Sequence, residues 1–423
     1  MRKTKQTEMQ IQKHRTRVRF KLLNRIVAAL LLLPLLSGCW DRIEIEERAV
    51  VLGVSIDTVS KEEGEKEEDE VSHINSSLKA PKKEMIRLAV QIALPGRIPL
   101  GPGMSGGKGS ESQTVWVIDV VGHSVDDAIS NLQQQVSNKL FFGHLRIIIV
   151  SEAMAKRGLE DVNDFFRRNP EVRRMAWMVI AKGEALPLMK AVPKLERVPT
   201  LYMISTLDEG IKLGKFPKDY IGVFWSNVSK LGREGVLPYV DMKKEQNIGL
   251  KGLAYFVGDK LVGVSNPLEI AGYLGILGEN PAGYSTYVQV QGSDAVMVKA
   301  TQRSSKIKAS IKNGVPHFKV DISIDLNLES KLTHDIEINN VDILREIEVN
   351  EEKKAKIFYE KLIMKTQNKG SDIFGFGEII RGKKAGYWNA NIKTGENWQK
   401  IYKECTFDIG VTIKLRRIGM KAR

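Results

Sequence analysis

Residues 317–328, HFKVDISIDLNL, alternate strictly between apolar and polar side chains. Successive side chains of a β-strand point to opposite faces, so this pattern predicts a strand with one buried and one exposed face. Residues 306–311 alternate in the same way, and Asn313-Gly314, a dipeptide that favours a tight hairpin turn, lies between the two segments. The alternation returns at residues 407–415. Together these segments predict an antiparallel sheet in the C-terminal third of the chain.

A helix is expected to cover the dry face of this sheet. Between about residues 350 and 367 apolar side chains recur at spacings of three and four, which indicates a helix with one apolar side. The C-terminal part, residues 283–423, is therefore expected to be an α+β domain.

The preceding part of the chain also mixes both kinds of element. Strands are predicted at 48–57, 85–94, 115–121, 145–150, 175–181, 253–257 and 260–264. Helices are predicted at 124–140, 152–157, 161–168 and 217–231. The 385 residues after residue 38 are too many for one ordinary core. We therefore expect an α+β fold of three mixed domains in series, at 39–205, 206–282 and 283–423.

Two stretches between these strands are predicted to be solvated loops. Residues 61–70 hold seven acidic residues and two lysines and no apolar side chain, so they cannot bury enough surface to offset chain entropy. Residues 95–109 contain six glycines and three prolines, which favour turns over regular structure.

The N-terminus has the pattern of a lipoprotein signal peptide. An apolar run at residues 26–36 follows a strongly basic segment and ends in Leu36-Ser37-Gly38-Cys39. We expect cleavage between Gly38 and Cys39, removal of residues 1–38, and lipidation of the Cys39 thiol. The alternative is a short uncleaved membrane anchor. Eleven residues at about 1.5 Å each are too short to cross a hydrocarbon core of about 30 Å.

Charge and cysteine content exclude other classes of protein. The total net charge is +14, but residues 1–38 contain nine Lys and Arg against one Glu, so residues 39–423 carry only +6. Positive and negative residues are interspersed there, which argues against a nucleic-acid partner. Besides Cys39 the chain contains only Cys405, which leaves no internal disulfide and no cysteine-based metal site.

Several motif matches are rejected because their surroundings are wrong. Residues 101–106 fit G-x-G-x-x-G, and residues 103–107, which include Ser105, fit G-x-S-x-G, but neither follows a predicted strand or opens a helix. Residues 377–384 resemble a phosphate-binding loop until Lys384, which occupies the place of the magnesium-binding Ser or Thr. We predict no catalytic, cofactor-binding or metal-binding residue, and no cofactor.

Histidines, arginine pairs and tryptophans are further candidates. The histidines after residue 38 are His73, His123, His144, His317 and His334. No two of them are three to five residues apart, the spacing typical of metal ligands. There are two basic clusters: Arg167-Arg168 with Arg173-Arg174, and Arg416, Arg417, Lys421 and Arg423. Each is either a solvated surface segment or a contact for lipid phosphates or an acidic partner. Trp388 and Trp398 are expected to pack in or beside a core.

Several segments, in this order, resemble one family of lipoproteins. They are Cys39-Trp40-Asp41, Val51–Asp57, Phe142–Arg146, Leu250–Phe256, Asp372–Gly377, Trp388, Trp398 and Arg417-Ile418-Gly419. In these segments the chain is similar to the Ger(x)C lipoproteins, the C subunits of spore germinant receptors. The resemblance covers nearly all of the chain after Cys39.

The resemblance implies a function and its setting. It implies a lipid-anchored, non-enzymatic subunit on the outer leaflet of the spore inner membrane, needed for nutrient-triggered germination. Its partners would be a multi-span A subunit and a transporter-like B subunit. Only Cys39 is carried over as a functional residue. The alternatives are a solute-binding lipoprotein of an ABC importer, for which two lobes of alternating strands and helices are expected, and a lipoprotein hydrolase, which only the Ser105 motif supports.

Overall fold

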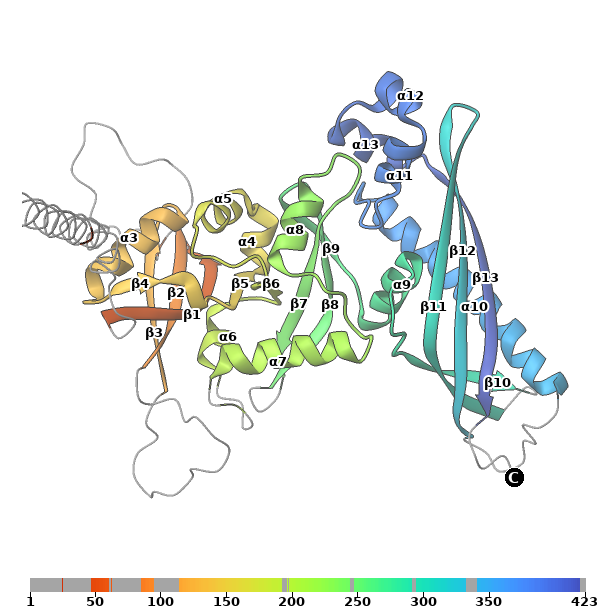
Figure 1. Ribbon diagram of the computed structural model, residues 1–423, viewed down its shortest axis with the longest axis horizontal. Helices are drawn as coiled ribbons and strands as arrows, with labels where there is room; N and C mark the ends of the chain where they lie inside the picture. Colours follow the sequence, from red (N-terminus) through yellow and green to blue (C-terminus); the bar gives the residue numbers. More distant parts are fainter. Residues whose placement is uncertain are drawn as a thin grey trace, which may run out of the picture. The chain divides into compact units, whose positions relative to one another are not determined.

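The structure of the protein is a computed structural model (Figure 1). The residues it describes are 47–60, 85–94, 114–191, 198–243, 247–290, 294–331 and 341–418, with the single positions 25, 62 and 196. The chain divides into two compact units, Met1–Arg48 and Ala49–Arg423. Only residues 25, 47 and 48 of the first unit are described. The helices and strands discussed below belong to the second unit, apart from Arg48, where the first strand begins.

The first sheet is mixed. Its strands, in chain order, are β1 (Arg48–Thr58), β2 (Ile86–Ala93), β3 (Val115–Gly122), β4 (Lys139–Phe141), β5 (Ile147–Ser151), β6 (Trp177–Ala181), β7 (Val236–Met242), β8 (Ile248–Val257) and β9 (Lys260–Val264). Across the sheet they are arranged in the order β3-β2-β1-β5-β6-β7-β8-β9, and β4 pairs with β1. β1, β2 and β3 form an antiparallel meander. β1, β5, β6 and β7 run parallel, and β8 and β9 are antiparallel to their neighbours.

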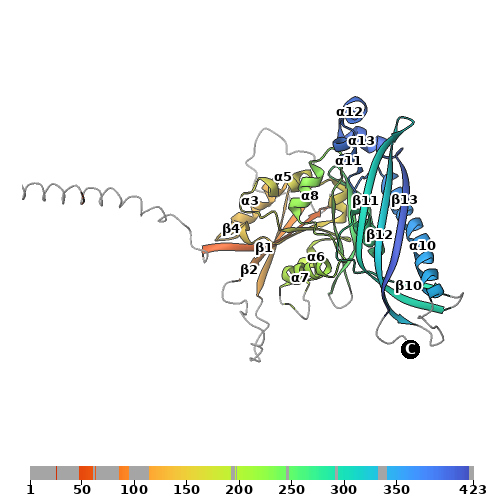
Figure 2. The same cartoon turned by 45° about the vertical axis from the view of Figure 1, so that its right-hand side comes forward.

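Helices cover both faces of this sheet. One face carries α3 (Val125–Gln135), α4 (Glu152–Arg157), α5 (Glu160–Arg168) and α8 (Ile221–Val228). The other carries α6 (Leu186–Lys190), α7 (Pro199–Lys212) and α9 (Pro267–Leu277). Figures 1 and 2 show α6 and α7 on the side of the sheet opposite α3, α5 and α8. Because β5 and β6 are buried on both faces, their residues are almost uniformly apolar rather than alternating.

The second sheet lies in the C-terminal third. Its order is β10-β11-β12-β13, and its strands are β10 (Ser285–Val290), β11 (Asp294–Lys312), β12 (Val315–Lys331) and β13 (Thr406–Ile418). The helix α10 (Val341–Gln367) packs along β13, and Ile343 and Ile347 join the sheet's apolar cluster. Among the described residues, four short helical segments follow α10: α11 (Phe376–Lys383), α12 (Ala385–Tyr387), η5 (Trp388–Ile392) and α13 (Gly395–Tyr402).

The α+β class is confirmed, and one part of the predicted sheet is corrected. β11 and β12 are antiparallel as expected, and the predicted helical cover is α10. β10, which was not predicted, is also antiparallel to β11. β13 instead pairs with β12 in parallel, with Phe407 opposite Phe318. The crossover through α10 to α13 returns the chain to the end of the sheet where β12 begins, and such a long connection permits parallel pairing. Alternation showed which face is dry but not the direction of the strand.

The two predicted domain limits fall at different places relative to the sheets. The limit at 205/206 lies within α7, and the first sheet continues on both sides of it. The limit at 282/283 lies between α9 and β10, where the chain passes from the first sheet to the second. Three separately folding domains therefore stay a prediction. The predicted loop stretches 61–70 and 95–109 lie outside the described residues, except for position 62.

Candidate functional site

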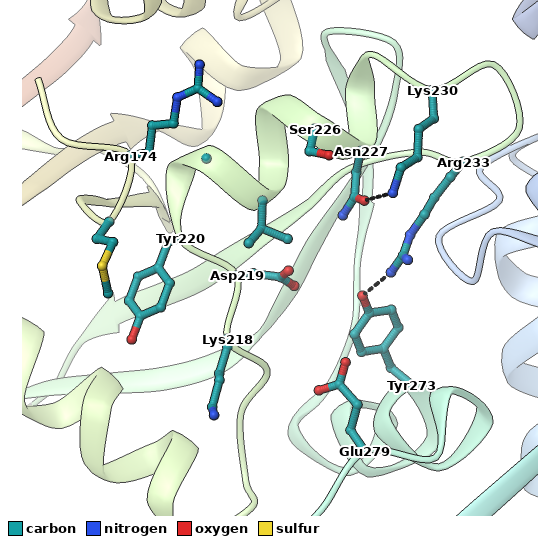
Figure 3. Close-up of a pocket in the computed structure, with 13 residues that line it drawn as sticks. Arg174, Lys218, Asp219, Tyr220, Ser226, Asn227, Lys230, Arg233, Tyr273 and Glu279 are labelled. Carbon is teal, nitrogen blue, oxygen red and sulfur yellow. Dashed lines mark hydrogen bonds between the residues drawn. The ribbon is translucent and has the colours of Figure 1, made fainter. Parts of the chain in front are cut away.

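A pocket of about 470 Å³ lies where the loops on either side of α8 meet the end of α9 (Figure 3). Its lining, which has both charged and apolar side chains, consists of Arg174, Met175, Lys218, Asp219, Tyr220, Gly222, Val223, Ser226, Asn227, Lys230, Arg233, Tyr273 and Glu279. A volume of this size is typical of small-molecule sites. We therefore take it as the candidate functional site.

Asp219 lies in the loop before α8 and is the most unusual residue of the pocket. Its side chain is only 4 % exposed, yet Oδ2 has no hydrogen-bond partner. Burial raises the pKa of Asp219 from 3.8 to about 7, against the opposing effect of the nearby Arg233 charge. Buried carboxylates in stable proteins are normally paired or hydrogen-bonded, so an unpartnered oxygen here needs an explanation.

Arg233, in the loop after α8, has a buried donor nitrogen without a hydrogen-bond partner. One terminal nitrogen, Nη2, donates a hydrogen bond to the Tyr273 hydroxyl at 3.2 Å. The Nε atom of Arg233 is buried and has no partner. Within the described part of the chain no ion pair of 4 Å or less joins Arg233 to Asp219, although their charges interact. The pocket thus holds one unused acceptor and one unused donor.

Further charged groups surround these two. Lys230 donates to Asn227 Oδ1 at 3.2 Å, and in Figure 3 both side chains lie above the space between Asp219 and the Arg233 guanidinium. Glu279 projects into the same space from the end of α9, whereas the guanidinium of Arg174 points away from Asp219. Cations outnumber anions among the lining residues, so the pocket has an excess of positive charge.

The second sheet holds one wall of the pocket in place. The guanidinium of Arg303, on β11, is buried and donates to the backbone carbonyls of Glu279, Pro281 and Gly214, the last two at 3.0 and 3.3 Å. These bonds tie the loop after α9 to the loop that leads to Asp219. A guanidinium suits this task because its donors form a rigid fork.

Replacing Gly214 by alanine is expected to destabilise the fold by about 2 kcal/mol. Gly214 has φ +66°, and an added Cβ would lie 2.0 Å from the Pro281 carbonyl oxygen. Gly183→Ala is the matched control, because its φ is +81° but open space surrounds it. Chemical denaturation should show the smaller loss for Gly183→Ala, about 1 kcal/mol, from its left-handed backbone alone. Equal losses would contradict the tight approach of the two loops.

The residues predicted from the sequence lie elsewhere. Gly38 and Cys39 are outside the described residues, as is the glycine-rich segment with Ser105. Residues 377–384 form α11 and its C-cap, with Gly377 N–H donating to Asp372 Oδ2 at 2.8 Å. A helix fastened in this way is not a phosphate-binding loop, in agreement with the rejection of that motif.

The histidines are spread over separate elements. His73 and His334 fall outside the described residues, and His123 and His144 lie before α3 and β5. His317 is buried at the start of β12, where Nδ1 lies 2.8 Å from Thr406 Oγ1 and Nε2 lies 3.1 Å from Asp408 Oδ2. Among the residues described, no group of three or more His, Cys, Asp or Glu is placed to hold a metal ion.

Arginines of both basic clusters form surface ion pairs, and the two tryptophans are buried. Arg168 pairs with Asp164 at 2.8 Å on the exposed side of α5, and Arg416 pairs with Asp325 at 3.1 Å. Lys421 and Arg423 lie outside the described residues, and the side chain of Arg417 is not described. Trp388 and Trp398 are buried with their ring centroids 5.9 Å apart, which confirms that they pack in the core.

Sequence reasoning missed the pocket almost entirely. Of its lining, only Arg174 was a candidate functional residue, as part of the basic cluster Arg167-Arg168 with Arg173-Arg174; most of the others fall within the helix predicted at 217–231, which gave them no functional role. Asp219, Arg233 and Tyr273 belong to no motif, and nothing distinguishes the lone aspartate at 219 from a surface residue. Only its burial in the fold makes it unusual.

Comparison with known proteins places the chain in a family. Residues 41–242 match the family described as "Spore germination protein N-terminal domain", and residues 251–419 match "Spore germination B3/ GerAC like, C-terminal". This chain belongs to the GerAC-like family of spore germination proteins. The two matched segments meet between β7 and β8, within the first sheet.

Individual relatives agree over almost the whole chain. It is 23 % identical over 411 residues to the putative spore germination protein YfkR of Bacillus subtilis, covering 95 % of this chain and 98 % of the relative. It is 24 % identical over 421 residues to the spore germination protein KC of the same organism, covering 94 % and 96 %. The crystal structure of the GerBC protein has the same fold, with a TM-score of 0.52 at 19 % identity, and the match covers 78 % of this chain and 94 % of that one.

The predicted family is thus confirmed, and with it a role in spore germination. The matches favour a germinant receptor subunit over the solute-binding lipoprotein of an ABC importer. The antiparallel arrangement of β10 to β12 also differs from the two lobes of alternating strands and helices expected for such a lipoprotein.

Proposed function

We propose that this protein is a lipid-anchored, non-enzymatic subunit of a spore nutrient germinant receptor, needed for nutrient-triggered germination. Its partners are a multi-span A subunit and a transporter-like B subunit. The anchor is acylated Cys39, and the protein resides on the outer leaflet of the spore inner membrane.

The observation that carries this proposal is where the family match begins. It starts at residue 41, two positions after Cys39, and continues to residue 419. The family sequence therefore begins where the signal-peptide pattern predicts that the mature chain begins. Among the helices that the structure describes, none is long and apolar enough to cross a membrane.

Lipidation would give the protein its place beside its partners. Two acyl chains, at about 0.8 kcal/mol for each buried CH₂ group, hold a protein stably on a membrane. Confinement to the membrane plane raises the effective concentration of the folded part near membrane partners, so modest interfaces suffice for assembly.

The pocket lining supports a binding role. It includes Ser226 but no histidine or cysteine, so it does not hold the Ser–His or Cys–His pair used by many hydrolases. Asp219 Oδ2 and Arg233 Nε, which have no hydrogen-bond partner, offer complementary charges to a ligand.

Replacing Cys39 by alanine is expected to abolish acylation and to impair nutrient-triggered germination at least tenfold, without changing the fold. Mass spectrometry of the native protein should find the acyl chains on wild-type Cys39 and an uncut leader in the variant. Cys405→Ala is the control, because Cys405 is buried and its thiol donates to the Ile401 carbonyl inside the C-terminal part. Normal germination by a Cys39→Ala protein that is exported at wild-type level would refute the proposal.

A further inference from the structure

We propose that the pocket between Asp219 and Arg233 binds a small zwitterionic molecule that carries both an ammonium and a carboxylate group. The ammonium would donate to Asp219 Oδ2, and the carboxylate would accept from Arg233 Nε. This inference stands apart from the lipid anchor and from the receptor partners, because it uses only residues of the folded part.

The first argument is the pair of unused polar atoms. Asp219 Oδ2 and Arg233 Nε are both buried, and neither has a hydrogen-bond partner. Leaving a charged group desolvated and unpaired is costly, and a ligand that pairs with both groups removes the cost. In Figure 3 the two side chains approach the same space from opposite sides, Asp219 from the loop before α8 and Arg233 from the loop after it.

The second argument is that neither group can satisfy the other. Arg233 is directed by its bond to the Tyr273 hydroxyl, and Asp219 is set by the loop that Arg303 holds through Gly214. A cationic ligand would pair with Asp219 and leave Arg233 Nε without an acceptor. An anionic ligand would do the reverse, so only a ligand with both charges uses both atoms.

The remaining lining residues set the ligand's size and character. Lys230, which in Figure 3 lies on the same side of the pocket as Arg233, adds positive charge there, which favours a full carboxylate over a neutral acceptor. Met175 is 69 % exposed and Val223 is 37 % exposed on the lining. Such side chains provide an apolar surface that a ligand could cover. The volume of about 470 Å³ suits a molecule of amino-acid size with water beside it.

Ionisation of Asp219 links ligand binding to pH. Burial raises the pKa of Asp219 to about 7, while Arg233 lowers it and Glu279 raises it. Lys218, Lys230, Arg174 and the Tyr273 hydroxyl also line the pocket. An ammonium group pairs with the ionised carboxylate, so binding should strengthen from pH 6 to pH 8 and should release about half a proton per ligand at pH 7.

The test is calorimetric titration of the full-length protein in detergent at pH 8. The zwitterionic probes are glycine, L-leucine and L-glutamine, which differ in size and polarity but share the charged groups. Saturable binding of at least one of them at or below 10 mM is expected. Isoamylamine and 4-methylpentanoate, which keep the leucine skeleton but lack one charged group each, should bind at least tenfold more weakly than L-leucine if leucine is the probe that binds. If glycine is the probe that binds, its singly charged analogues are ethanolamine and acetate. If L-glutamine binds, its analogues are 4-aminobutanamide and glutaramate.

Variants locate the binding. Asp219→Asn and Arg233→Met should each weaken it at least tenfold, whereas Asp164→Asn and Arg168→Met, which alter the exposed ion pair on α5, should leave it unchanged. Lys230→Met replaces Arg233→Met if that variant fails to fold, and thermal melting shows which variants are folded. The proposal is overturned if no zwitterion saturates by 10 mM, if a singly charged analogue binds as tightly, or if the folded pocket variants bind normally.

Discussion

Replacing Asp372 by alanine is expected to destabilise the folded protein by about 3–5 kcal/mol. Asp372 is fully buried and lies between α10 and α11. Oδ1 accepts from the Gly375 N–H at 2.9 Å, and Oδ2 accepts from the Gly377 N–H at 2.8 Å. The indole Nε1 of Trp398 donates to the same Oδ2 at 3.0 Å.

The size of this effect reflects the groups that the substitution leaves unpaired. Alanine removes the acceptor but keeps three buried donors, and each unsatisfied donor costs about 1–3 kcal/mol. These donors belong to the loop before α11, to α11 and to α13, so the carboxylate joins elements that pack against the second sheet. Burial raises the pKa of Asp372 to about 6, and the group is therefore ionised at pH 7.5.

Urea denaturation at pH 7.5 measures this loss. Asp164→Ala is the matched control, since Asp164 is half exposed and pairs with Arg168 on the surface. Its expected cost is below about 0.5 kcal/mol. Asp372→Asn should fall between the two, because one oxygen acceptor remains while the new amide faces a donor. A cost of Asp372→Ala no greater than that of Asp164→Ala would show that the carboxylate does not organise this region.

Asp219→Asn is expected to remove a pH-dependent loss of stability that totals about 4 kcal/mol from below pH 3.8 to above pH 7, of which about 2 kcal/mol falls between pH 5.5 and pH 8. The pKa of Asp219 is about 7 in the folded protein against an ordinary value of 3.8, a rise caused mainly by burial. The folded state therefore binds the proton more tightly than the unfolded state. The contribution of Asp219 to stability is fully present below pH 3.8 and is lost as pH rises through 7.

The measurement compares wild type and Asp219→Asn at pH 5.5 and pH 8. Other buried carboxylates with raised pKa values, such as Asp372 and Glu234, contribute equally to both proteins, so the difference isolates position 219. The variant should gain stability relative to wild type as pH rises. At pH 8 the net gain should be about 1–3 kcal/mol, because the unpartnered asparagine amide retains part of the burial cost. A constant difference between the two pH values would show that Asp219 is paired or solvated in solution.

The stability changes of the Asp372 and Asp219 variants distinguish a buried carboxylate that is fully hydrogen-bonded from one that has an oxygen without a partner. Asp372 is buried with every contact made, and its loss should weaken the fold. Asp219 is buried with an oxygen unpartnered, and its neutralisation should strengthen the fold. Stability given up at one position is typical of binding sites, where a ligand supplies the missing partner.

Several elements could be predicted because their signals lie in consecutive residues. The alternation at 317–328 predicted β12, and the strands predicted at 253–257 and 260–264 lie in β8 and β9, which pair in an antiparallel hairpin. The helix α4 occupies the predicted residues, 152–157. Helices α7 and α9 were missed. α9 is buried on most of its sides, so its helical period was weak. In α7 the buried residues Thr200, Met203, Ile204 and Leu207 follow the spacing of one helix face, so that signal was present in the sequence and was overlooked.

The α+β class, the dry faces of the strands, the signal-peptide pattern ending at Cys39 and the family could all be predicted from the residues alone, because each depends on residues that are neighbours or ordered along the chain. The parallel pairing of β13 with β12, and the common pocket of Asp219 and Arg233, became visible only in the folded protein. Strand direction depends on the path of a long crossover, and the cost of a charge depends on its burial. Both are properties of packing between distant segments, and no local pattern records them.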